Sequence, residues 1–120
     1  TACFRNIFHN LKYPDDLKRA AYGDLTLWTI LGFYGKGKYL DNILPCKYRL
    51  HLNSIHSSKS KNAQAFSKLY NDIAIYKYNL NKGEYRAVYI KLFEVLMFAL
   101  RNLGFYGFMW SLSQASIRKS

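Results

Sequence analysis

The longest apolar run of the chain covers residues 84–113 and predicts a helix that needs a partner surface. Its interior carries five strongly polar residues, and at 3.6 residues per turn all but Arg86 fall on one narrow stripe, while apolar residues occupy nearly all the rest of the helix. This stripe consists of Lys91, Glu94, Arg101 and Asn102. A helix that is apolar almost all round is buried in a protein core or in a membrane. We therefore expect this run to be covered by other parts of the protein, by a neighbouring subunit or by lipid.

The charges within this run argue against a single clean membrane span. Glu94 and Arg101 fall inside any window of about 20 residues, and each charge near a bilayer centre costs on the order of 3 kcal/mol. Glu94 lies three residues from Lys91 and seven from Arg101, and a satisfied ion pair on the polar stripe explains this acid more simply than a catalytic role. Aromatic clusters occur both in protein interiors and at membrane interfaces, so both environments remain open.

The end of the run is rich in glycine and aromatic residues, and we expect it to pack against a partner. If the helix continues, Gly104 and Gly107 lie on one face and allow another backbone to approach closely. If Gly104 ends the helix in a left-handed cap, an aromatic tail follows. The sequence LGFYG occurs at residues 103–107 and also at 31–35, which weakly indicates two similarly packed glycine pairs. The candidates for partner packing are Gly104, Phe105, Tyr106, Gly107 and Trp110.

A second helix is predicted for residues 63–78, where apolar side chains recur at helical spacing. Ser60 or Asn62 can cap its start. The connection at residues 79–83 is rich in asparagine and glycine and is short enough to return the chain antiparallel. The strongest structural prediction is therefore an αα-hairpin in which this helix packs on the helix that begins near Glu84.

The N-terminal half predicts shorter and less regular elements. Residues 1–13 have the spacing of a short amphipathic helix, and residues 15–22 follow Pro14 as a second short helix that Gly23 ends. Asp24 is placed to cap an apolar helix over residues 25–34. Alternating side chains at 47–53 predict the one short strand.

Together these patterns predict a mainly α fold. We expect a small helical domain with a C-terminal antiparallel αα-hairpin, an irregular N-terminal half and at most one short strand. Residues 1–120 form a single domain in this prediction, with an N-terminal arm at 1–13 and an aromatic C-terminal tail at 104–120.

The chain is strongly basic, with 18 Lys and Arg against 7 Asp and Glu and a formal charge of +11. Such a charge attracts polyanions, including nucleic acids and acidic lipid headgroups. No acid occurs between Asn42 and Asn71, so this stretch is the best polyanion site, although a solvated charged loop explains it as well. The candidate phosphate contacts are Lys47, Arg49, Lys59, Lys61 and Lys68.

The sequence carries no pattern that indicates catalysis, a metal site or a bound cofactor. The three histidines lack the spacing and acidic companions of a metal site, and Cys3 and Cys46 are expected to be reduced thiols. Cys46 and His51 have no orienting group that would make them a catalytic pair. The GKGK at residues 35–38 lacks the spacing of a phosphate-binding loop and is expected to be a solvated turn. We therefore expect a protein that is not an enzyme and that does not act on a small-molecule substrate.

The first functional hypothesis is a non-catalytic accessory subunit of a large multi-subunit assembly. Basic charge, aromatic content and a start at Thr1, which suggests a removed targeting peptide, favour a mitochondrial inner-membrane complex of the respiratory-chain or ATP synthase type. The expected location is the inner membrane or its matrix side, with other protein subunits as partners and membrane lipid as a further contact. The alternative is a basic structural RNA-binding protein of a mitochondrial ribosome.

Overall fold

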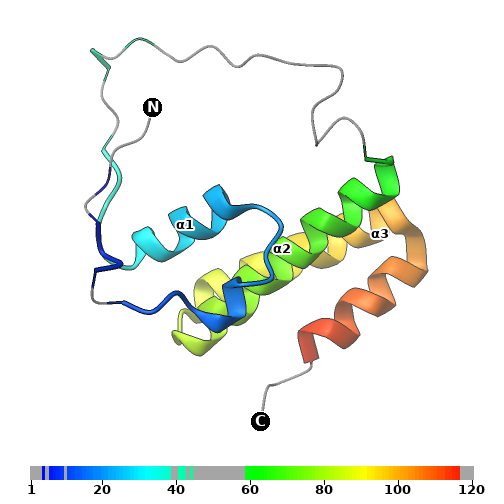
Figure 1. The fold of residues 1–120 in the computed structure, drawn as a ribbon. Helices are drawn as coiled ribbons and strands as arrows, with labels where there is room; N and C mark the ends of the chain where they lie inside the picture. The colour runs from blue at the N-terminus through cyan, green and yellow to red at the C-terminus, as the bar shows by residue number, and fades with distance from the viewer. Residues whose placement is uncertain are drawn as a thin grey trace.

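The protein is mainly helical, as the sequence predicts. The computed structural model describes Phe4 and residues 6–9, 11–38, 41–42, 44 and 59–116. In these ranges the elements are a 3-10 turn, η1 (Asp15–Leu17), and the helices α1 (Gly23–Gly32), α2 (Lys61–Asn81) and α3 (Tyr85–Ser116), with no strand (Figure 1). The strand predicted for residues 47–53 lies outside the described residues.

Helices α2 and α3 form the predicted antiparallel hairpin and lie side by side in Figure 1. The side chain of Ser60 caps α2, because its Oγ accepts a hydrogen bond from the backbone N–H of Ala63 at 3.2 Å. At the other end, Gly83 adopts a φ of 77°, a conformation that favours glycine, and the chain reverses there. Both the cap and the short connection were readable in the sequence.

The core lies on two sides of α2. On one side, Leu69 and Ile73 pack against Val95 and Ala99 of α3. A second cluster, in which α2 meets η1 and α1, consists of Leu17, Ile30, Ala74, Ile75 and Tyr78. Because α2 is covered on both sides, it is the central helix, whereas α3 is covered mainly where it meets α2.

α3 is broken at Gly104, whose φ of 66° and ψ of −161° are not helical. After this break, the C-terminal segment, residues 105–116, runs back as a second helical piece, seen in orange to red in Figure 1. The positive φ expected of a helix-ending glycine is present, and the aromatic residues that follow it form a second helical piece. The prediction of an uninterrupted helix with Gly104 and Gly107 on one face is wrong, because the break changes their relative direction.

The two LGFYG sequences have different environments, so the prediction of similarly packed glycine pairs is wrong. A Cβ atom added to Gly32 or Gly35 would meet nothing within 4 Å. Gly107, in contrast, is buried against the preceding part of α3. The glycines of the first copy lie in open space at the end of α1, and the second copy forms the break between two helical pieces.

The N-terminal half is less helical than its spacing predicts. Only η1 forms after Pro14, and Gly23 begins α1 instead of ending a helix. Asp24 does not cap α1: it lies in the first turn, and its Oδ1 accepts from the N–H of Leu25 at 2.9 Å. The described residues before Pro14 are not helical, because their apolar side chains are used to cover the core. The side chains that do so are Ile7, Phe8 and Tyr13.

Ionisation of Tyr78, a member of the second core cluster, makes the stability of the fold depend on pH. Its side chain is 3% exposed, and burial raises the pKa of its phenol above the ordinary 10.0, with a smaller contribution from Tyr34. The folded state therefore holds this proton more tightly than the unfolded state. The contribution of the Tyr78 phenol to the stability of the fold is fully present below pH 10.0. It is lost as the pH rises through the pKa that this phenol has in the folded state.

We therefore expect the free energy of unfolding, measured by urea titration, to fall from about pH 10 upward because Tyr78 ionises more readily when unfolded. Tyr78→Phe keeps the ring against Phe33 but removes the ionising group, so its stability should fall less steeply over the same range. Equal slopes for the two proteins would show that other groups dominate.

Candidate docking surface

The side of α3 that points away from α2 is apolar and exposed. Tyr89 is 71% exposed and Phe93 is 66% exposed, whereas Val95 and Ala99, on the covered side, are 1% and 0% exposed. We call this surface the outer face of α3. It consists of Tyr85, Tyr89, Ile90, Phe93, Met97 and Leu100. α2 covers only part of a helix that is apolar almost all round, which leaves the outer face without a partner within the described residues.

Aromatic exposure continues into the C-terminal segment. Phe105 and Tyr106 are 71% and 76% exposed. Met109 and Leu112 are exposed in the same segment. Three of the five predicted packing residues, Gly104, Phe105 and Tyr106, therefore lie at the surface.

Gly104, Gly107 and Trp110 serve the fold of the chain itself. Gly104 forms the break in α3, and Gly107 is buried beside Ala99, whose carbonyl oxygen would lie 3.3 Å from an added Cβ. The ring of Trp110 packs edge-on against Phe66 and Tyr70 of α2, with centroids 5.6 and 5.1 Å away. The close approach predicted for an outside partner is thus made between two pieces of this chain.

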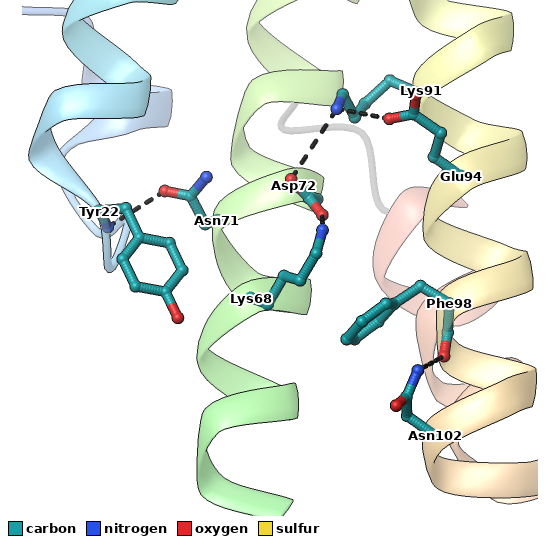
Figure 2. A network of polar contacts seen from close by, with 8 residues as sticks. All are labelled: Tyr22, Lys68, Asn71, Asp72, Lys91, Glu94, Phe98 and Asn102. Atoms are coloured by element: carbon teal, nitrogen blue, oxygen red, sulfur yellow. Dashed lines mark hydrogen bonds and ion pairs between the residues drawn. The ribbon is translucent and has the colours of Figure 1, made fainter. Parts of the chain in front are cut away.

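A chain of ion pairs joins α2 to α3 and uses two of the four residues of the polar stripe, Lys91 and Glu94 (Figure 2). The buried carboxylate of Asp72 pairs with Lys68 through one oxygen, and its other oxygen lies 3.9 Å from Nζ of Lys91. Lys91 in turn contacts Glu94 at 2.6 Å, so the predicted Lys91–Glu94 pair is confirmed. Asp72 was not identified from the sequence, because its burial depends on α3 packing beside it.

The charges at the outer face are few and mainly positive. Arg86 and Arg101 are exposed, and each lies within four residues of a side chain of the outer face on the helix. Glu94 is the one acid of α3, and its charge is matched by Lys91. The outer face is therefore an apolar and aromatic surface with a weak positive charge.

The predicted polyanion contacts are only partly described. Lys47 and Arg49 lie outside the described residues, as do Cys3, Cys46, His51 and His56. Lys59 and Lys61 are exposed beside the start of α2, whereas Lys68 pairs with Asp72 and lies over the ring of Phe98, with Nζ 4.7 Å from its centroid. Lys61 and Lys68 also line one open depression of about 330 Å³ between α2 and α3.

Three further observations bear on function. In the part of the chain that the structure describes, no three His, Cys, Asp or Glu side chains come together as metal ligands would. A search of the same residues finds no helix with the length and hydropathy of a membrane span. Comparisons with protein-family models, with curated proteins and with solved structures gave no match to this chain. Within the described residues, the structure is a helical hairpin with an apolar face on α3 that α2 does not cover.

Proposed function

We propose that this protein is a non-catalytic accessory or structural subunit of a large multi-subunit assembly and that it docks through the outer face of α3. The observation that carries the proposal is the run of exposed apolar side chains on that face, with Tyr89 and Phe93 about two-thirds exposed or more. Contiguous apolar surface of this kind marks interaction sites in soluble proteins, because leaving it in water is unfavourable. Aromatic residues and Met are also enriched in protein interfaces.

The assembly we propose is a mitochondrial inner-membrane complex of the respiratory-chain or ATP synthase type, with this chain at the membrane or on its matrix side. The formal charge of +11 supports a location beside anionic headgroups, and tyrosine side chains suit a membrane–water boundary. The partner of the outer face is an apolar surface of another subunit. The ion pairs of Lys91 with Asp72 and Glu94 neutralise those charges, and Arg86 and Arg101 add positive charge beside the contact.

The test is to place a charge in the centre of the outer face. Phe93→Glu should weaken incorporation into the native particle more than tenfold, because burying an unpaired carboxylate costs about 2 kcal/mol or more. Incorporation is measured by sedimentation of a tagged copy from source cells. The matched control is Leu25→Glu, which adds the same charge at a 47% exposed leucine of α1.

Both variants should keep the helical circular dichroism of the parent protein. If Phe93→Glu sediments with the particle as well as Leu25→Glu does, the outer face is not the docking surface. If both fail to assemble, added negative charge is the cause, and the proposal is again contradicted.

A second candidate function is structural RNA binding in a mitochondrial ribosome. The observation that favours it is that Lys61 and Lys68 line one depression, with Lys59 close by in the sequence. The same sedimentation distinguishes the two candidates when the extract is divided between ribonuclease and mild detergent. A particle that requires detergent for release supports the membrane complex, and a particle that ribonuclease alone collapses supports the ribosome.

A further inference from the structure

The depression of about 330 Å³ between α2 and α3 is built from three separate parts of the fold. α2 contributes its first two turns, α3 contributes residues shortly before its break, and the segment before α1 contributes Tyr22. The lining residues are Tyr22, Lys61, Gln64, Ala65, Lys68, Phe98 and Asn102. This volume is close to the lower end of the range for small-molecule sites, about 300–1,000 Å³.

The charge of this depression is positive. No acidic side chain is among its lining residues, and two lysines are. The charge of Lys68 is matched by Asp72, because the four linked groups Lys68, Asp72, Lys91 and Glu94 sum to zero. Lys61 therefore supplies the uncompensated charge. It stands in the first turn of α2, where the exposed ends of backbone N–H groups add a partial positive charge.

The depression also offers amide donors and an aromatic wall. The Nδ2 of Asn102 donates to the carbonyl of Phe98 at 2.8 Å, and this amide nitrogen carries a second hydrogen. Figure 2 shows the ring of Phe98 pointing from α3 toward α2, with Asn102 one turn further along α3. Ala65, which is buried, adds apolar surface. An anionic group and an apolar body can thus be held together.

We propose that this depression binds a small phosphate-bearing ligand, with the phosphate on Lys61 and an apolar portion of the ligand against Phe98. A phosphate monoester in solution and the headgroup of an anionic phospholipid share this chemistry. The site is distinct from the outer face of α3, because Phe98 is five residues after Phe93 and points about 140° away from it around the helix. The inference therefore does not depend on the proposed docking function.

The experiment measures binding of phenyl phosphate to the whole chain by isothermal titration calorimetry. A parallel arm measures cosedimentation with vesicles of phosphatidylcholine, with and without phosphatidic acid. Each arm compares the parent protein with Lys61→Gln and with Lys36→Gln. Lys36 is exposed in the segment after α1 and is not among the lining residues, so Lys36→Gln removes an equal charge elsewhere.

We expect saturable binding of one phosphate group that Lys61→Gln weakens at least fivefold and Lys36→Gln leaves nearly unchanged. An effect of Lys61→Gln confined to phenyl phosphate assigns the site to a soluble ligand, and an effect confined to vesicles with phosphatidic acid assigns it to a headgroup. Equal losses in the two variants would show attraction to net charge alone and would overturn the proposal, as would the absence of saturable binding in both arms.

Discussion

Leu69→Ala is expected to lower the free energy of unfolding by about 3–5 kcal/mol. Leu69 is 0% exposed and packs with Val95 and Ala99 in the contact between α2 and α3. Removing its branched end takes away apolar burial and leaves a cavity that the helices fill only partly. Because small domains are stable by only about 5–15 kcal/mol, the loss is a large fraction of the total. Urea unfolding followed by circular dichroism measures it.

Leu44→Ala is the matched control, because the same atoms are removed from a leucine that is 90% exposed. Its unfolding free energy should remain within about 0.5 kcal/mol of the parent value. A small effect of Leu69→Ala, similar to that of Leu44→Ala, would mean that the hairpin contact is not the main core of the protein.

Gly107→Ala is expected to destabilise the protein by about 1–3 kcal/mol and to release the C-terminal segment from α2. The added Cβ would collide with Cβ of Leu103 and would lie 3.3 Å from the carbonyl oxygen of Ala99. These two atoms cannot easily move aside, because the carbonyl oxygen of Ala99 belongs to the helix backbone and Cβ of Leu103 is bonded directly to it. Trp110 should then lose its contacts with the α2 aromatic rings.

Fluorescence in a Trp28→Phe background reports on Trp110 alone, since the chain has two tryptophans. Exposure of the indole should shift its emission to longer wavelength in Gly107→Ala. Gly32→Ala is the control, because its Cβ would meet nothing within 4 Å. If Gly107→Ala keeps the parent emission and stability, the C-terminal segment does not depend on the close approach at this glycine.

The two glycines near the end of α3 also change what a binding experiment there would mean. The sequence places Gly104 and Gly107 at a contact with a partner, but both determine how the chain packs on itself. Their substitution would therefore disturb the fold together with any docking. Phe93 on the outer face is the better position for a test of assembly, because its exposed side chain supports little of the core.

The hairpin could be predicted from the sequence because its signals are local. Each signal depends on residues that are close in the chain. These signals are a serine three residues before the amide that it caps, an apolar repeat at helical spacing, and a short connection with glycine. The Lys91–Glu94 pair is predictable for the same reason, since one turn of helix brings the two side chains together. In the N-terminal half, local spacing failed: Ile7, Phe8 and Tyr13 pack against the core without forming a helix, and tertiary contacts commonly override local helix propensity.

The candidate site could be predicted only in part. The apolar excess of residues 84–113 shows that this helix needs more cover than one neighbouring helix provides. The acid-free stretch predicts Lys61 and Lys68 as contacts for an anionic partner. Neither pattern tells which side α2 covers or that Phe98 and Asn102 stand beside those lysines. Asp72 reads as an ordinary polar residue of α2 until Lys91 is packed beside it.

The helical class of this protein, its hairpin and its surplus of apolar surface follow from the order of the residues alone, because helical periodicity and capping act over a few residues. The break of α3 at Gly104, the return of Trp110 to Phe66 and Tyr70, and the exposure of the outer face become visible only in the folded chain. These features depend on which distant side chains meet, and burial among distant residues is settled by the packing of the whole chain.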